Sequence, residues 1–415
     1  MRLLIISPER LEAPLTGGSL RTGFIASGLG RKFETLVMVQ QSPIELEHLL
    51  GSVPQFCSAR WLSIHDKNLN HSRTFVEKNW GRFERWNERR EQALWQGAFR
   101  DWHIGPLRTW RTAIHAVCKD IKPDVAIIEH TRNAATLDYV RQLLPNCVRV
   151  INSHNVDSVL HQTVTATNSR PFKGNHFVRR ALNHERRLDK WADALWTCSD
   201  VDTRRYEEIG VRCGSIATVP NGIDTSAVAF RSLQQKRLPR LLFIGTLCYE
   251  PNEQGLLWFH RHVWPLLKMS MPNLHWRIVG RYPTAAVERI ATDDDIELFA
   301  DAPSTATHLD VSSVFICPLF FGSGTRLKLL EAFSAGIPVV STTIGAEGLN
   351  AQHGEHLLLA DDALGFVRSI TELIEDSSVA NRLRTQARQF VVQKFDWEII
   401  VGDAATRLAS YVQAR

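Results

Sequence analysis

Short apolar runs alternate with helical patterns along most of the chain, and this alternation limits the possible folds more than any other feature. In the N-terminal half the runs cover residues 3–7, 35–40, 124–130, 147–154, 194–199 and 215–221. In the C-terminal half they cover residues 240–245, 275–280, 296–300, 313–319, 338–342 and 356–360. Such alternation is typical of βαβ units. It predicts an α/β fold in which each half builds its own parallel sheet.

The length of the chain and the position of its polar stretches predict two domains. With 415 residues, the chain is too long for one ordinary hydrophobic core and suits two domains of roughly 200 residues. Residues 224–240 are polar and lack a clear apolar period, which is typical of a linker. We therefore predict an N-terminal domain over residues 1–223 and a C-terminal domain over residues 241–395. A last helical pattern covers residues 396–415.

The composition favours a cytoplasmic protein. The seven cysteines are scattered, without a CxxC pair or a histidine spacing typical of zinc, and this indicates reduced thiols. The apolar run at the N-terminus is too short for a signal peptide, and the sequence has no apolar stretch of roughly 18 residues that could span a membrane. The formal net charge of +5 is modest for this length.

The stretch GSGTRLKLLE at residues 322–331 has the composition of an anion site. Gly322 and Gly324 follow a predicted strand and precede a helical pattern, so they fall at a strand-to-helix turn. In a doubly wound sheet this turn lies at the carboxyl edge, where ligands bind. Backbone N–H groups and the helix dipole favour an anion there. Arg326 and Lys328 add full charges, which suits a diphosphate.

Glu331 lies further into the same helix and is poorly placed for phosphate. A carboxylate at this distance suits a pair of sugar hydroxyls, as an acidic residue does toward ribose in dinucleotide sites. The whole stretch then fits a nucleoside diphosphate. The alternative is an ordinary GSG loop followed by a helix whose charges are the solvated face.

Four stretches together resemble the retaining glycosyltransferases of family four, which have the GT-B fold. They are PLTGGSLRT (14–22), VPNGID (219–224), FIGTLCYEPNEQGLLWF (243–259) and GSGTRLKLLEAFSAGIPVVSTTIGAEGL (322–349). They occur in the family's order. The resemblance implies two Rossmann-like domains facing across a cleft, with the nucleotide sugar bound by the C-terminal domain and the acceptor by the N-terminal one. It also implies that the helix at residues 396–415 crosses back to the N-terminal domain.

The resemblance assigns the donor site in the C-terminal half to six residues of one motif, Ser323, Gly324, Thr325, Arg326, Lys328 and Glu331. The family often carries two glutamates eight positions apart; Glu331 matches the second, and Ser323 stands at the first. The family also often has an Arg and a Lys after the first strand of the C-terminal domain, where this chain has Thr246 and Asn252. The diphosphate then depends more heavily on the two cations of the motif.

The resemblance also marks residues of the N-terminal half. Gly17 and Gly18 form a glycine pair after the first strand, and a lone pair by itself is equally typical of a flexible turn. The resemblance implies that this loop closes over the donor phosphate and the acceptor, with Arg21 as an anion contact. His130 and His154 each end a predicted strand. The resemblance places His154 against the donor sugar and leaves His130 as a candidate on the acceptor side, whereas a lone histidine at a strand end is more often structural.

The reaction implied is the transfer of a hexose from a nucleoside diphosphate sugar to a hydroxyl of a glycan or glycolipid, with retention of anomeric configuration. Arg326 and Lys328 would stabilise the leaving diphosphate, so that no metal or other cofactor is needed. Two alternatives stay open. A sugar-nucleotide epimerase can share the architecture but would carry several acid/base residues. A non-catalytic binding subunit is favoured by Ser323.

Two other segments have open interpretations. Residues 79–110 interleave tryptophans with arginines, a pattern that suits a peripheral membrane contact, a lipid diphosphate acceptor, or a helix whose tryptophans pack on the domain. Nucleic acid is a weaker option because the rest of the chain is nearly neutral. The acidic run at residues 293–295 could hold a metal with a diphosphate, but it falls on a predicted solvated turn, and we expect no metal site.

Overall fold

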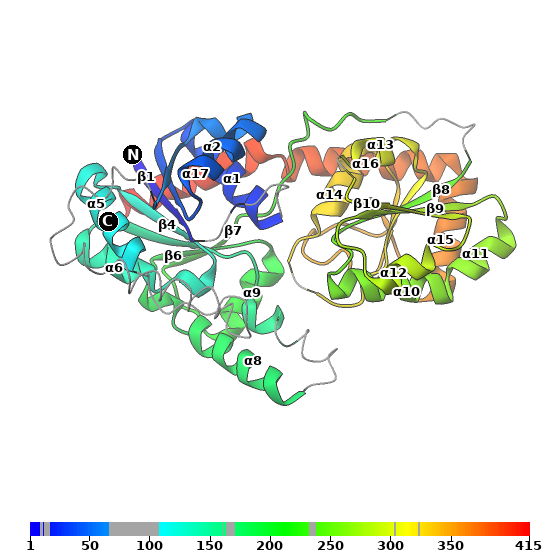
Figure 1. The fold of residues 1–415 in the computed structure, drawn as a ribbon, viewed down its shortest axis with the longest axis horizontal. Helices are drawn as coiled ribbons and strands as arrows, with labels where there is room; N and C mark the ends of the chain where they lie inside the picture. Colours follow the sequence, from blue (N-terminus) through cyan, green and yellow to red (C-terminus); the bar gives the residue numbers. More distant parts are fainter. Residues whose placement is uncertain are drawn as a thin grey trace. The chain divides into compact units, whose positions relative to one another are not determined.

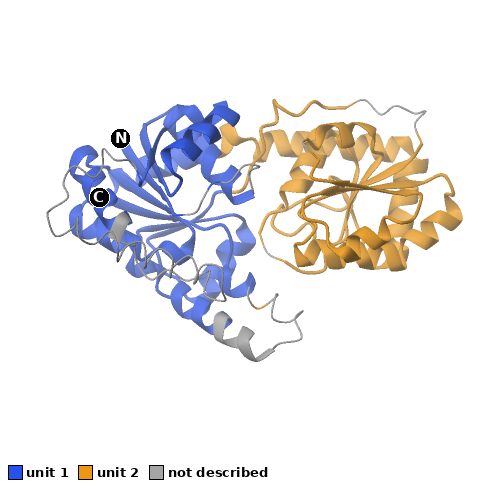
Figure 2. Cartoon of the chain, in the orientation of Figure 1, with its two compact units in different colours: residues 1–161, 170–219, 401–415 blue, residues 162–169, 220–400 orange. Residues whose placement is uncertain are grey.

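The computed structural model describes residues 1–8, 11, 17–65, 108–160, 162, 171–231, 238–302, 304–322 and 324–415. The chain divides into two α/β units (Figure 2). Unit 1 consists of Met1–His161, Arg170–Val219 and Val401–Arg415, and unit 2 consists of Gln162–Ser169 and Pro220–Ile400. The last residues of the chain therefore belong to the first unit.

Unit 1 is built on a seven-stranded sheet in the order β3-β2-β1-β4-β5-β6-β7 (Figure 1). Each recorded pairing of neighbouring strands in this sheet is parallel. The strands are β1 (Arg2–Ser7), β2 (Glu34–Val39), β3 (Arg60–Ser63), β4 (Val125–Glu129), β5 (Val148–Asn152), β6 (Ala194–Thr197) and β7 (Ser215–Thr218). The carboxyl ends of β4 and β5 are neighbours, which brings the residues that follow them to one edge of the sheet.

Helices cover both faces of this sheet (Figure 1). They are α1 (Gly17–Gly30), α2 (Pro43–Ser52), α5 (Arg108–Ile121), α6 (Thr136–Leu143), α8 (Pro171–Glu185), α9 (Asp200–Ile209) and the end of α17 (Trp397–Gln413), with short 3₁₀ turns η1 (Pro54–Ser58), η3 (Thr131–Asn133) and η4 (Leu188–Lys190). The helix starts follow local signals. Ser42 and Glu45 form a reciprocal capping box at α2, and Ser199 caps α9.

Unit 2 has a six-stranded sheet in the order β10-β9-β8-β11-β12-β13, also with parallel pairing. The strands are β8 (Arg240–Ile244), β9 (His275–Gly280), β10 (Ile296–Ala300), β11 (Val314–Cys317), β12 (Val339–Ser341) and β13 (Leu358–Leu359). The helices are α10 (Glu250–His262), α11 (Trp264–Ser270), α12 (Ala285–Ile290), α13 (Ala306–Val311), α14 (Leu327–Ala335), α15 (Ala363–Glu375), α16 (Ser377–Lys394) and the start of α17.

The sheet of unit 2 is buried on both faces, which explains its continuous apolar runs. Along β11, Val314 and Ile316 belong to one core cluster with Trp276, whereas Phe315 and Cys317 belong to the other. Successive strand residues point to opposite faces, so each face needs its own apolar set. This requirement is the physical reason why the predicted runs were easy to identify as strands.

Every predicted run contains a strand in the structure, and the parallel α/β fold is confirmed. The sequence analysis missed β3. This strand has only four residues, lies at the edge of the sheet, and its burial is complete only at Ser63. Because an edge strand packs fewer side chains, it has no continuous apolar run to reveal it.

The close approach of α1 to the end of η1 gives a stability prediction. A Cβ added at Gly30 would lie 2.4 Å from the carbonyl oxygen of Ser58, and backbone cannot move aside easily. We expect Gly30→Ala to destabilise unit 1 by about 1–3 kcal/mol. Gly51→Ala in α2 is the matched control, because a Cβ there meets nothing within 4 Å. Chemical denaturation of both variants measures the difference, and equal stability would contradict the prediction.

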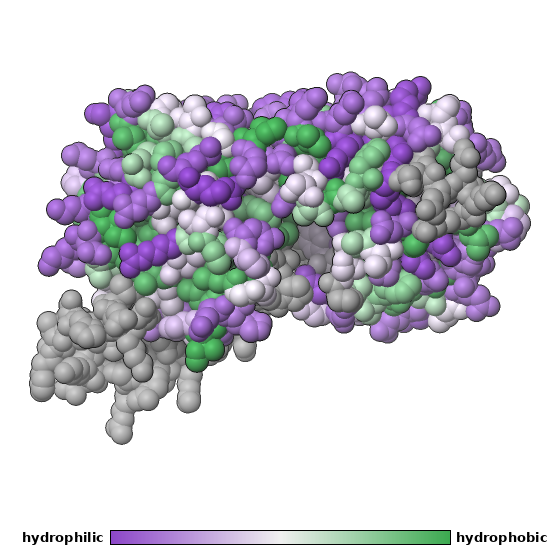
Figure 3. All heavy atoms as spheres, turned by 90° about the horizontal axis from the view of Figure 1, so that it is seen from above, coloured by the Kyte–Doolittle hydropathy of each residue, from purple (hydrophilic) through white to green (hydrophobic). Residues whose placement is uncertain are grey.

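The described surface has mixed polarity. On the face drawn in Figure 3, hydrophilic and apolar residues are interspersed. Among the residues that the structure describes, no helix is long and apolar enough to cross a bilayer. All seven cysteines are free thiols, as the scattered spacing predicted.

Candidate functional site

The turn between β11 and α14 in unit 2 wraps around a buried arginine. Gly322 has φ 120° and Gly324 has φ 80°, conformations that side-chain-bearing residues rarely adopt. Arg326 is 7% exposed, and its Nη1 donates to the carbonyl oxygen of Gly324 at 3.2 Å. A Cβ at Gly322 would lie 3.0 Å from Nη2 of Arg326. The two glycines are therefore needed for the loop to approach the guanidinium.

Lys328 lies in the first turn of α14 and points toward the start of α10. Its Nζ donates to Oδ1 of Asn252 at 2.7 Å and lies 4.2 Å from the centroid of the Phe243 ring. Burial lowers the pKa of Lys328 to about 8; the nearby Cys317 thiol acts against this and the charge of Arg326 adds to it. Among the residues that the structure describes, no carboxylate pairs with Lys328. An anionic ligand would supply the missing negative charge.

Gly245 leaves room for this ammonium group, and Asn252 accepts a hydrogen bond from it. A Cβ at Gly245 would lie 2.9 Å from Nζ of Lys328 and 2.8 Å from Nδ2 of Asn252. Asn252 is buried and donates to the carbonyl oxygen of Thr246 at 2.7 Å, which turns its own carbonyl oxygen toward Lys328. We name Asn252, Gly322, Gly324, Arg326 and Lys328 the Lys328 cluster.

Glu331 lies in the second turn of α14 and has a different partner. The hydroxyl of Thr305 donates to its Oε1. Burial raises the pKa of Glu331, and the hydrogen bond from Thr305 opposes that shift. The carboxylate is thus held by a neutral hydroxyl rather than neutralised by Lys328, which leaves it able to accept further hydrogen bonds.

Unit 1 holds a second group of polar residues, at the carboxyl ends of β4 and β5. Oε2 of Glu129 lies 2.6 Å from Nε2 of His154. Nδ2 of Asn152 donates to both carboxylate oxygens of Glu129, at 3.0 and 3.2 Å, and Oδ1 of Asn152 accepts from Arg21 at 2.6 and 3.1 Å. All four side chains are almost fully buried. Together with His130 they form what we call the His154 cluster.

His130 completes this cluster by stacking on His154, with ring centroids 3.8 Å apart. Its φ of 65° is unusual for a residue with a side chain, and such strain is concentrated at functional sites. Burial lowers the pKa of both histidines, and for His154 the charges of His130, Arg21 and Arg132 add to the effect. Burial raises the pKa of Glu129, opposed by His130, by the Asn152 hydrogen bond and by Arg21.

Gly18, at the start of α1, lies against this cluster. A Cβ at Gly18 would lie 3.1 Å from Nδ1 of His154. Nδ1 is buried and has no hydrogen-bond partner among the described residues. A buried ring nitrogen without a partner, beside the N-terminus of a helix, is suited to receive a ligand.

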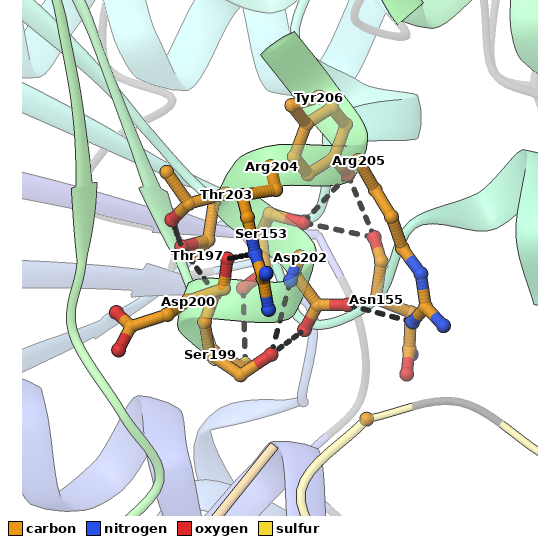
Figure 4. A network of polar contacts seen from close by, with 12 residues as sticks. Ser153, Asn155, Thr197, Ser199, Asp200, Asp202, Thr203, Arg204, Arg205 and Tyr206 are labelled. Carbon is orange, nitrogen blue, oxygen red and sulfur yellow. Dashed lines mark hydrogen bonds and ion pairs between the residues drawn. The ribbon is translucent and has the colours of Figure 1, made fainter. Parts of the chain in front are cut away.

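A hydrogen-bond network fixes the turn that carries His154 (Figure 4). The Tyr206 hydroxyl donates to the carbonyl oxygen of Asn155 and lies 2.8 Å from the hydroxyl of Ser153. Burial raises the pKa of Tyr206 well above its usual value, so its hydroxyl stays protonated. The Cys198 thiol also donates to the carbonyl oxygens of Ser153 and His154. The turn is therefore held from β6 and from α9.

The predicted site residues fall into two groups, one in each unit. Unit 1 contains Gly17, Gly18, Arg21, His130 and His154, and the last four of these lie together at the His154 cluster. Unit 2 contains Gly324, Thr325, Arg326, Lys328 and Glu331, of which Gly324, Arg326 and Lys328 belong to the Lys328 cluster. Ser323 lies outside the described residues. Sequence reasoning missed Glu129, Asn152 and Thr305. The signal for the first two was their position, because each lies within a predicted apolar run and is the last residue of β4 or β5 in the structure, at the same sheet edge.

The remaining candidates take no part in these groups. In the acidic run at residues 293–295, Asp293 accepts from Nε1 of Trp264 at 3.0 Å and Asp295 pairs with Lys268 at 2.6 Å. No metal-binding group of acidic, histidine or cysteine residues occurs within the described part of the chain. Of the segment at residues 79–110, positions 79–107 lie outside the described residues, and Trp110 is buried in α5.

Comparison with known proteins gives matches for both the sequence and the fold. Residues 238–376 match the family described as Glycosyl transferases group 1. The chain is 30% identical over 171 residues to an uncharacterized 44.6 kDa protein in the cps region of Klebsiella pneumoniae, which is 38% of this chain and 42% of that protein. It is 25% identical over 261 residues to glycogen synthase of Mycobacterium tuberculosis, which is 59% of this chain and 61% of that protein. The chain thus spans less than two thirds of either relative.

A solved structure matches the whole chain. The crystal structure of Anabaena Alr3699/HepE in complex with UDP superimposes with a TM-score of 0.67, at 13% identity, over 99% of this chain and 100% of that one. Two α/β units with parallel sheets, the second of which contains the glycosyl transferases group 1 match, confirm the predicted architecture. The chain has the GT-B fold.

Proposed function

We propose that the protein is a glycosyltransferase that moves a hexose from a nucleoside diphosphate sugar to a hydroxyl of a glycan or glycolipid acceptor, with retention of anomeric configuration. The observation that carries this proposal is the pair of neighbouring cations at the β11–α14 turn. Arg326 is buried, and Lys328 has a neutral amide and an aromatic ring as its recorded partners. Two adjacent cations at a strand-to-helix turn suit a diphosphate.

In this proposal the Lys328 cluster stabilises the leaving diphosphate electrostatically. Negative charge grows on the diphosphate as the bond to the anomeric carbon breaks, and Arg326 and Lys328 meet that charge. The acceptor oxygen forms its bond to the same carbon, and its proton passes to the departing phosphate. The sugar then keeps its configuration without a covalent intermediate or a metal ion. Glu331 binds the ribose hydroxyls.

The relatives support a sugar substrate, and HepE was solved with UDP bound. Incubation with a panel of nucleotide sugars and glycan acceptors tests the proposal. Transfer to an acceptor, or slow hydrolysis of one donor, supports a transferase. A binding signal without any change in donor or acceptor would instead support a non-catalytic subunit.

The His154 cluster favours an epimerase as the second candidate. Three titratable side chains lie together here, those of Glu129, His130 and His154. An epimerase transfers protons to and from its substrate and therefore needs several acid/base residues in its site. The same panel separates the two functions. Conversion of a nucleotide sugar to its epimer, with the nucleotide still attached, would support the epimerase and contradict the transferase.

Uridine diphosphate is expected to raise the melting temperature, whereas EDTA is expected to leave activity unchanged. The reason is that the diphosphate is held by Arg326 and Lys328 rather than by a metal. Ligand at about 100 times its dissociation constant stabilises the fold by about 2.7 kcal/mol. Differential scanning fluorimetry with uridine diphosphate, and with uridine as the control without phosphates, measures the shift. Loss of turnover in EDTA that magnesium or manganese restores would contradict this prediction.

We further propose that the segment at residues 79–110, apart from Trp110, which is buried in α5, contacts an anionic membrane surface, or an acceptor that carries a lipid diphosphate. The support is their mixture of arginine and tryptophan in the sequence. Sedimentation with vesicles that contain anionic lipid, at low and high salt, tests the membrane contact. Absence of salt-sensitive binding would restrict the segment to other roles.

A further inference from the structure

We propose that Glu129 is a positioning residue that holds His154 as the neutral imidazole protonated at Nε2, so that Nδ1 accepts a hydrogen bond from a hydroxyl of the ligand. This inference rests on the proposed function for the identity of the ligand, a sugar. The arrangement of Glu129 and His154 is independent of it.

The geometry of the carboxylate carries the first step. Oε2 of Glu129 lies 2.6 Å from Nε2 of His154, while Nδ2 of Asn152 donates to both carboxylate oxygens. The side-chain hydroxyl of Thr22 also donates a hydrogen bond to Glu129. An ionised carboxylate can accept from all of these donors at once. A protonated carboxyl would have to turn a hydrogen toward one of its neighbours.

The charge of Arg21 supports the same state. Arg21 is 1% exposed, so its guanidinium is almost fully removed from bulk water. It donates to Oδ1 of Asn152, and the other end of that amide donates to Glu129. Asn152 therefore connects the buried cation to the carboxylate, and the positive charge of Arg21 favours the ionised form of Glu129.

His154 must then donate from Nε2 and stay neutral. Burial lowers the pKa of His154 well below its usual value, and the charges of His130, Arg21 and Arg132 add to the effect. In a neutral imidazole, a proton on Nε2 leaves Nδ1 as an acceptor. Nδ1 is buried, has no partner among the described residues, and faces Gly18. It can receive a hydroxyl but not the oxygen of a phosphate.

The tautomer can be measured directly. In protein with ¹⁵N-labelled histidine, the two nitrogens of His154 are assigned by comparison with His154→Gln. At pH 7 we expect Nε2 to be protonated and Nδ1 to be unprotonated. A protonated Nδ1, alone or together with Nε2, would overturn the proposal. This measurement needs no substrate, so its outcome is independent of whether the protein transfers sugar.

Steady-state kinetics test whether the positioning of His154 by Glu129 matters for catalysis. Glu129→Gln is expected to lower kcat/KM by about tenfold, because a glutamine can present its amide to Nε2 and so permit the other tautomer. The same variant should keep the melting shift caused by uridine diphosphate. Glu208→Gln, an exposed change on α9, is the control. Wild-type kcat/KM in Glu129→Gln together with an altered tautomer would contradict a positioning role, and an unaltered tautomer would contradict control by Glu129.

Discussion

Replacing Lys328 with alanine is expected to lower kcat and kcat/KM together, by about ten- to a hundredfold. Its ammonium group meets charge that grows on the leaving diphosphate, so the interaction is stronger in the transition state than with bound donor. A hydrogen bond to a charged partner contributes about 1.5–3 kcal/mol, which sets the range. Steady-state kinetics with the donor varied measure both constants. Arg326→Ala is expected to lower kcat and kcat/KM in the same way.

Two further variants separate charge from packing. Lys328→Met retains a long side chain over the Phe243 ring but removes the charge, and it should lose as much activity as Lys328→Ala. Lys394→Ala is the matched control, because Lys394 also lies over a phenylalanine ring of unit 2, at 5.2 Å from the centroid of Phe390. Near wild-type kinetics for Lys328→Met would show that the reaction does not need the charge of Lys328.

The pKa of Lys328 adds a dependence on pH. Burial lowers this pKa to about 8 in the free protein, so the ammonium form predominates at pH 7 and is lost above pH 8. A bound diphosphate favours the charged form and raises the pKa. Affinity for uridine diphosphate should therefore be constant up to about pH 7.5 and should fall as the pH rises toward 9. In Lys328→Met this fall should disappear.

The fold was predictable because both faces of each sheet are buried. Strands such as β11 must be apolar at successive positions, and this leaves a mark in the sequence that does not depend on any partner. The loop at Gly322 and Gly324 was predictable for a related reason, since positive φ angles select glycine. The edge strand β3 has neither a continuous apolar run nor a glycine with a positive φ angle, and so it was missed.

The candidate site was predictable only in part, because its contacts join residues that are distant in the sequence. Lys328 and Asn252 are 76 positions apart, and Glu129 and His154 are 25 positions apart. The sequence analysis noted Asn252 only as a departure from the family pattern. In the structure its side chain accepts a hydrogen bond from Lys328. The neutral Asn252 therefore positions a cation that comes from a different helix, α14.

The His154 cluster shows the same limit more sharply. His154 was selected by resemblance, but nothing in the sequence pairs it with Glu129. The pairing follows from the order of the sheet, in which β4 and β5 are neighbours in register and Glu129 lies beside Asn152. A correct strand order would have brought these residues together. Their protonation states also depend on burial, which a sequence does not give.

Glu331→Gln is expected to raise the KM for the donor by about ten- to a hundredfold while kcat changes little. The carboxylate is proposed to bind the ribose hydroxyls, and these contacts change little during the reaction, so their loss weakens the ground state and the transition state equally. Burial raises the pKa of Glu331, and the hydroxyl of Thr305 donates to it and helps to keep it ionised.

Thr305→Val provides the companion test. It removes the hydroxyl but not the carboxylate, so we expect a smaller rise in donor KM than in Glu331→Gln. Loss of this hydrogen bond also removes an influence that lowers the pKa of Glu331, so the rise in KM should be larger at pH 6 than at pH 8. Donor KM and kcat measured across this range for both variants decide the matter. A fall in kcat without a change in KM for Glu331→Gln would place the carboxylate at the reacting sugar instead of the ribose.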